Sequence, residues 1–312
     1  MPPPSLSYSR CPLPLFIPPP SSPTFYPAPA LSHFYPAPVL SQQGRTGADG
    51  ATKPMAIISL PIFLFGLIVG SFLNCVIFRL EKGKSFLKGR SYCPHCKHQL
   101  VWRDLIPVLS FIILKRRCRY CKKLISWQYP LVEMATGILF VIIINTQLSA
   151  INYQLSIISC IYYLLIVSFL IIIFIYDLKH FIILDKVLFP AIAVSFLYLI
   201  INNQLSIINY SFSALGALTF FLLIYFFSKG KCLGFGDVKL AILLGLFLGW
   251  PRIILALFLS FVIGGIIGLG LIILSKKKLK SEVPFAPFLI FGTLIAFFWG
   301  EQIINWYLSL VF

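Results

Sequence analysis

After residue 55 the chain is dominated by long apolar runs that contain almost no charged residues. Eight such runs lie at about 56–78, 130–145, 156–176, 187–203, 211–228, 238–250, 252–275 and 285–300. A helix needs roughly 20 residues to cross the hydrocarbon core of a bilayer. Only 11% of the residues are charged and 59% are hydrophobic, which leaves too little polar surface for a soluble globule. We therefore expect an all-α, polytopic membrane protein with about eight transmembrane helices.

Basic residues are distributed unevenly among the connections between these runs. The chain has 26 Lys and Arg against nine Asp and Glu, a formal net charge of +17. Basic residues gather in 79–123 and in alternate later connections, whereas the connections near 146–155 and 204–210 have none. Apart from Arg252, this is the positive-inside pattern. It places the loop 79–129 in the cytoplasm and both chain ends outside, and it favours a membrane surface over nucleic acid as the partner of the positive charge.

The first 54 residues differ from the rest of the chain. Residues 1–54 hold 14 of the 22 prolines and almost no charge, so we expect a disordered or polyproline-like extension without a core. Two interpretations are open: translation starts at Met55, which we favour, or the extension is genuine. The remainder divides into 55–129, a first transmembrane helix with a polar loop, and 130–312, a transmembrane core.

The loop 79–129 carries four cysteines in two pairs, Cys93 with Cys96 and Cys118 with Cys121. Each C-x2-C pair closes a tight turn that directs two thiolates to one place, and two pairs complete a tetrahedral site that suits Zn²⁺. Four thiolates leave no open coordination position, so we predict a structural zinc knuckle that folds the cytoplasmic loop. The alternative is a set of redox-active or idle thiols.

Three rare acids lie at the ends of apolar runs. Asp177 ends one run, Asp185 follows eight residues later, and Asp237 precedes the sixth run. Acids near the membrane interior are costly and need a polar cavity, a partner or a proton. The topology places Asp177 and Asp237 on the cytoplasmic side. Two adjacent carboxylates can share one proton and act as general base and general acid, which is the chemistry of aspartic peptide hydrolysis.

The residues around these acids leave two interpretations open. Gly234 and Gly236 precede Asp237 and are expected to allow close backbone approach and positive φ angles, which would let Asp237 meet another carboxylate. Alternatively, Asp177 and Asp237 are ordinary helix-end charges paired with Lys179 and Lys239.

Six motifs occur in one order along residues 65–300. They are Gly70-Ser71-Phe72-Leu73-Asn74, the two cysteine pairs, Tyr129-Pro130-Leu131-Val132-Glu133, Asp177-Leu178 with Asp185, Gly234-Phe235-Gly236-Asp237-Val238-Lys239, and Pro284-Phe285-Ala286-Pro287-Phe288. In these motifs the chain resembles the prepilin peptidases, or type IV leader peptidases, which are membrane aspartic proteases of the GxGD type.

The resemblance implies a function and a set of site residues. Asp177 and Asp237 would be catalytic, and four further residues would support the catalytic loop: Gly234, Gly236, Lys239 and Asp185. The substrates would be type IV prepilin or pseudopilin precursors, whose leader is cut at the cytoplasmic face of a bacterial inner membrane. N-methylation of the new N-terminus with S-adenosylmethionine would follow. Glu133 matches a glutamate that the resemblance links to methyl transfer; a helix-start carboxylate favoured by the helix dipole is the alternative.

The chain also departs from the family pattern. Leu184 replaces a proline, Ala286 replaces a glycine, and Arg116 stands where many members have glycine, two residues before the third cysteine. The last change makes methylation a weaker expectation than cleavage. Two other classes of function remain open: a proton-coupled transporter that uses the acids, and a membrane-anchored zinc module that binds a partner.

Overall fold

Each predicted apolar run forms a helix in the computed structural model of the protein. The structure describes residues 52–83, 91–150, 156–202, 204–230, 233–273 and 283–311. The Pro-rich extension predicted for 1–54 lies almost entirely outside the described residues. The elements are α1 (Thr52–Glu81), the 3-10 turn η1 (Trp102–Asp104), α2 (Leu109–Ile113), α3 (Gln128–Ala150), α4 (Ser156–His180), α5 (Asp185–Asn202), α6 (Gln204–Ser228), α7 (Phe235–Leu248), α8 (Arg252–Ile273) and α9 (Ala286–Val311).

The prediction of an all-α, polytopic membrane protein is confirmed. Within the described ranges six helices are long and apolar enough to cross a membrane: α1, α3, α4, α6, α8 and α9. Of the eight predicted spans, those of α5 and α7 do not meet this criterion. The 14 residues of α7 extend about 21 Å at 1.5 Å per residue, which is less than the bilayer core.

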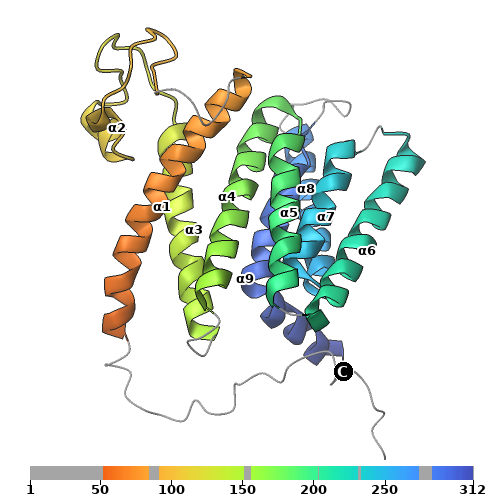
Figure 1. The fold of residues 1–312 in the computed structure, drawn as a ribbon. Coiled ribbons are helices and arrows are strands. Elements are labelled where there is room, and N and C mark those ends of the chain that lie inside the picture. The colour runs from red at the N-terminus through yellow and green to blue at the C-terminus, as the bar shows by residue number, and fades with distance from the viewer. Residues whose placement is uncertain are drawn as a thin grey trace, which may run out of the picture. The chain divides into compact units, whose positions relative to one another are not determined.

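The short helix α7 lies inside the bundle. Ten of its 14 residues are buried, and it packs against α5, α6, α8 and α9. On the other side of the bundle, α1 packs along α3, and both helices contact α4 (Figure 1). Helix α4 also contacts α5 and α9. It therefore separates the α1–α3 pair from the helices that surround α7.

Glycines bring α1 and α3 close together. A Cβ atom at Gly66 would lie 2.6 Å from the Cα of Gly137, and one at Gly70 would lie 2.7 Å from the Cα of Glu133. Small residues four positions apart let two membrane helices approach to backbone contact. The approach at Gly70 sets the position of the Glu133 backbone against α1.

Ion pairs tie helix ends together at both sides of the bundle. Helix α1 begins and α9 ends at one side (Figure 1), and there Arg252 of α8 pairs with Glu301 of α9. Arg252 was the exception to the positive-inside pattern, and its pairing neutralises the charge. At the opposite side, Lys179 of α4 pairs with Glu81 of α1 at 2.8 Å.

Candidate active site and four-cysteine loop

Asp177 lies in the last turn of α4, with its side chain directed into the bundle. The residue is only 5% exposed. Its carboxylate accepts a hydrogen bond from the backbone N–H of Ala286, the first residue of α9. The C-terminal end of a helix disfavours a negative charge, whereas the N-terminus of α9 favours one. The closing Pro-Phe-Ala-Pro-Phe motif thus supplies a hydrogen-bond donor to an acid more than 100 positions earlier in the chain.

Asp237 is the third residue of α7 and lies at the favourable end of its helix. It is 8% exposed, and its Oδ2 accepts the backbone N–H of Gly234 at 3.2 Å. The two carboxylates are close enough for the charge of Asp177 to affect Asp237. The structure therefore brings the two predicted catalytic acids together, with the N-termini of α7 and α9 directed at the pair.

The lysines beside the two acids have other partners. Lys179 is bound to Glu81, and the Nζ of Lys239 lies 2.8 and 2.9 Å from the two carboxylate oxygens of Asp185. No salt bridge to Asp177 or Asp237 occurs among the described residues. The interpretation of these acids as helix-end charges paired with the neighbouring lysines is therefore wrong.

The glycines of the Gly-x-Gly-Asp segment matter because they are small, and not because they adopt positive φ angles. Gly234 has φ −74°, and Gly236 is not among the residues with positive φ, so the positive-φ expectation is wrong. A Cβ at Gly236 would lie 3.1 Å from the Cβ of Ile183. Close packing of α7 on the α4–α5 connection explains a small residue at Gly236.

Lys239 and Asp185 connect the first turns of α7 and α5. Besides the ion pair, the ammonium group of Lys239 lies 5.6 Å from the ring centroid of Phe189 and 5.2 Å from that of Phe235. Both contacts are cation–π interactions. Lys239 therefore holds α5 against the segment that carries Asp237.

The four cysteines form one cluster, as the spacing predicted. The sulfurs of Cys93, Cys96, Cys118 and Cys121 all lie within 4.8 Å of one another. The two turns have the same internal hydrogen bonds. Lys97 N–H donates to the Cys93 carbonyl at 2.9 Å, and Lys122 N–H donates to the Cys118 carbonyl at 3.0 Å. Each lysine has φ 59°, so each pair forms the same turn.

This donor set fits a structural zinc ion. Tetrahedral Zn–S bonds of about 2.3 Å place sulfurs about 3.8 Å apart, and the sulfurs of Cys93 and Cys121 lie 3.9 Å apart. Burial opposes ionisation of the Cys118 thiol, but hydrogen bonds from the backbone of Cys121 and Tyr120 and from neighbouring thiols lower its pKa to about 7. At Cys96, a backbone hydrogen bond from His98 is outweighed by burial and by the neighbouring thiols, which raise the pKa to about 11. A thiolate at neutral pH is the form that binds metal.

Arg116 takes a conformation that favours glycine. Its φ is 62°, a left-handed value that costs a side-chain residue about 1 kcal/mol or more. Its guanidinium donates to the carbonyl of Ile125 at 3.2 Å and lies 5.3 Å from the ring centroid of Trp127. The departure from the family pattern at Arg116 is thus accommodated by contacts that a glycine could not make.

Glu133 joins the loop to the membrane helices. Its Oε2 accepts the backbone N–H of Val108 at 2.7 Å, and the side chain of Ser71 also bonds to it. Val108 has φ 60°, which is strained for a β-branched residue. Glu133 is the sixth residue of α3, beyond the first turn, so the helix-dipole interpretation does not account for it.

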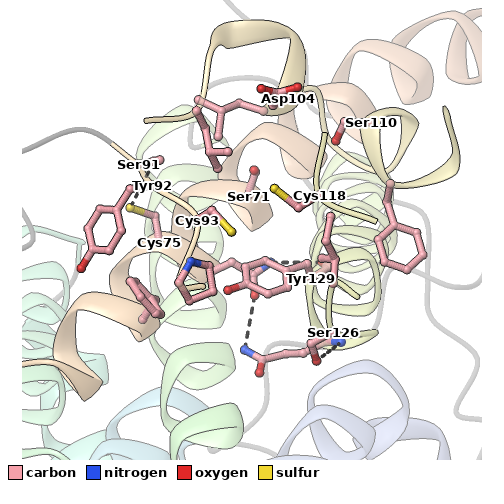
Figure 2. Close-up of a pocket in the computed structure, with 18 of the residues that line it drawn as sticks. Ser71, Cys75, Ser91, Tyr92, Cys93, Asp104, Ser110, Cys118, Ser126 and Tyr129 are labelled. Carbon is pink, nitrogen blue, oxygen red and sulfur yellow. Dashed lines mark hydrogen bonds between the residues drawn. The ribbon is translucent and has the colours of Figure 1, made fainter. Parts of the chain in front are cut away.

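A cavity of about 380 Å³ lies between the four-cysteine loop and the ends of α1, α3 and α4 (Figure 2). Glu133, Ser71, Asn74, Tyr129, Cys93 and Lys179 are among its lining residues. Asn74 is buried and donates to the carbonyl of Tyr129 at 3.1 Å. Sequence reasoning did not assign roles to Ser71 and Asn74, although the Gly-Ser-Phe-Leu-Asn motif contains both.

Two family models match the chain. Residues 64–146 match the bacterial peptidase A24 N-terminal domain, and residues 164–269 match the type IV leader peptidase family. No solved structure matches significantly.

Curated relatives cover the same part of the chain. A prepilin leader peptidase/N-methyltransferase of Aeromonas salmonicida is 31% identical over 282 residues, covering 80% of this chain and 94% of the relative. Proteins of the same name from Legionella pneumophila and Bacillus subtilis are 32% and 30% identical, covering 80% of this chain and 94% and 97% of their own lengths. The chain therefore belongs to the type IV leader peptidase family.

Proposed function

We propose that this protein is a membrane aspartic endopeptidase that cuts the leader peptide of type IV prepilin-like precursors and then methylates the new N-terminal residue. The observation that carries the peptidase assignment is the burial of two interacting acids, Asp177 and Asp237, with no salt bridge to either of them among the described residues. The relatives' names combine the same two activities. The protein would lie in a bacterial inner membrane with its active site facing the cytoplasm.

The acid pair supports hydrolysis through one shared proton. Two adjacent carboxylates do not both ionise readily, so one proton serves the pair. The ionised member takes a proton from a water molecule, whose oxygen attacks the peptide carbonyl carbon, while the protonated member donates to the carbonyl oxygen. Collapse of the tetrahedral intermediate breaks the C–N bond, and the amine leaves with a proton from the pair.

The depth of Asp177 and Asp237 suits a precursor with a basic leader followed by an apolar helix. The apolar helix would lie in the bilayer beside the membrane helices, which would place the scissile bond at the level of the helix ends. Both the leader and the loop of this protein are basic. Packing between apolar helices, and not charge attraction to the loop, would therefore hold the substrate.

The cavity beneath the loop suits the methyl-transfer step. Its volume of about 380 Å³ lies within the range of small-molecule sites. S-adenosylmethionine supplies an electrophilic methyl group, and Glu133 would accept the proton that the new N-terminal amine must lose before it reacts. Zn²⁺ on Cys93, Cys96, Cys118 and Cys121 would hold the loop in place and take no part in the reaction.

Co-expression with a pilin-like precursor tests both activities at once, with the mass of the mature N-terminus as the readout. Asp177→Asn and Asp237→Asn should each abolish cleavage, whereas Glu301→Gln, at the opposite side of the bundle, should not change it. Glu133→Gln should give a cleaved product without the added methyl group. Full cleavage by either aspartate variant would refute the peptidase assignment, and full methylation by Glu133→Gln would remove Glu133 from the methyl-transfer site.

A further inference from the structure

The short helix α2 has two different faces. Ser110, Phe111 and Leu114 line the cavity beneath the loop. Leu109, Ile112 and Ile113 point away from it and are 51%, 63% and 65% exposed. Their spacing of three and four residues places them on one side of the helix. Three large aliphatic side chains are thus presented outward by a loop that lies outside the membrane helices.

A hydrogen bond holds α2 beside the end of α3 that carries the four-cysteine loop. Val108, directly before α2, donates its N–H to Glu133, which is the sixth residue of the membrane-crossing segment 128–147 of α3. At 1.5 Å per residue, Glu133 lies about 7.5 Å inside that segment. Amphipathic helices at a membrane surface reach about 5–10 Å into the boundary between headgroups and acyl chains.

The surroundings of α2 are strongly basic. Residues 91–129 contain eight Lys and Arg and a single acid, Asp104, and Asp104 is paired with Arg119 at 2.8 Å. Lys115 and Arg117, which follow α2, are exposed. Trp102, in the 3-10 turn η1 of the same loop, is 70% exposed, with the guanidinium of Arg103 5.3 Å from its ring centroid. Exposed tryptophan beside basic residues is typical of membrane interfaces.

We propose that the outward face of α2, defined by Leu109, Ile112 and Ile113, docks the four-cysteine loop onto an anionic lipid surface. The aliphatic side chains enter the acyl boundary, and the basic residues contact lipid phosphates. Charge complementarity identifies lipid as the occupant. The precursor assumed in the proposed function has a basic leader, which this surface repels.

Hydrogen exchange of the full-length protein tests this docking without any assay of activity. The protein is reconstituted in vesicles of phosphatidylcholine alone or with phosphatidylglycerol, and amide exchange is followed over residues 105–117. A basic residue near an anionic surface contributes about a five-fold change in equilibrium, so exchange should be at least about five-fold slower in the anionic vesicles.

Variants separate the apolar and charged contributions. Ile112→Asp combined with Ile113→Asp should remove the protection in both kinds of vesicle. Lys115→Gln combined with Arg117→Gln should remove only the difference between them. Phe227→Asp, at an even more exposed apolar position on α6, should leave exchange over 105–117 unchanged. The reactivity of the four clustered cysteines toward an alkylating reagent checks that each variant keeps the loop folded.

Equal exchange in both kinds of vesicle, with no effect of the α2 variants, would overturn the proposal. Protection that appears only after a prepilin-like precursor is added would also overturn it, because the face would then belong to the substrate. Neither result bears on cleavage or methylation, so the proposed function is tested separately.

Discussion

The four-cysteine loop and the helical bundle place their functional groups by different means. In the loop, each turn is specified within six residues by its own hydrogen bonds, Lys97 to Cys93 and Lys122 to Cys118. In the bundle, Asp177 and Asp237 are 60 positions apart and come together because α4 and α7 both pack against α5 and α9. Local chemistry therefore determines the cysteine cluster, whereas helix packing determines the acid pair.

Helix α4 is the boundary between the two regions. Asp177 faces the helices around α7, while Lys179 lines the cavity beneath the loop. Residues two positions apart on a helix point about 200° away from each other. The acid pair and the cavity thus lie on opposite sides of α4. If cleavage uses the first and methylation the second, damage to one site should leave the activity of the other largely intact.

Loss of a cysteine thiolate should have the largest effect and should be confined to the loop. Structural zinc sites contribute about 10–16 kcal/mol of binding free energy, so Cys93→Ser should unfold the loop and abolish methylation while leader cleavage continues. Zinc content per chain and the mass of the mature product are the measurements. Cys160→Ser, a half-buried cysteine of α4, is the matched control. Unchanged zinc content in Cys93→Ser would contradict the assignment of the cluster.

Filling the α1–α3 contact should destabilise the protein next most strongly. A side chain at Gly70 meets the Glu133 backbone, and overpacking typically costs about 1–3 kcal/mol. Gly70→Leu should therefore lower the thermal unfolding temperature and reduce methylation. Gly216→Leu is the control, because a Cβ atom there meets nothing within 4 Å. Similar losses in both variants would mean that glycine removal itself, and not the close contact, is responsible.

Loss of the Lys239 contacts should weaken cleavage without abolishing it. An ion pair and cation–π contacts of this kind contribute about 1 kcal/mol together, so Lys239→Met should lower kcat by about five- to tenfold with little change in KM. Lys186→Met removes an adjacent exposed lysine and should have no effect. Asp185→Asn combined with Lys239→Met should be less than additive; strict additivity would show that the pair does not act as a unit.

The Glu81–Lys179 pair should matter least. Lys179 has a 40% exposed side chain, and exposed ion pairs contribute less than about 1 kcal/mol. Glu81→Gln should therefore change the unfolding temperature only slightly and should leave cleavage intact, because Lys179 points away from Asp177. A loss of cleavage as large as that of Lys239→Met would show that the two sides of α4 are coupled.

Sequence patterns predicted the helices and the cysteine cluster better than the details of the acid site. Apolar runs located eight helices, and the positive-inside pattern grouped the ends that carry Asp177 and Asp237. Sequence reasoning also offered, as an alternative, the pairing of Lys179 with Asp177 and of Lys239 with Asp237, which is wrong. It expected positive φ angles at Gly234 and Gly236, which is also wrong. Closeness in sequence does not predict ion-pair partners here, because residues two positions apart on a helix point in different directions and meet different partners.

The sequence by itself determined that the chain crosses a membrane in helices and that two cysteine turns form one cluster. Both follow from short-range rules: hydrophobic length and the reach of a C-x2-C turn. Only the tertiary structure decided that α7 is a short central helix, that the N-termini of α7 and α9 converge on the acid pair, and that Glu133 supports Val108. These features depend on how closely the backbones of distant segments approach each other. That distance is determined by the packing of whole helices, and a local sequence pattern does not encode it.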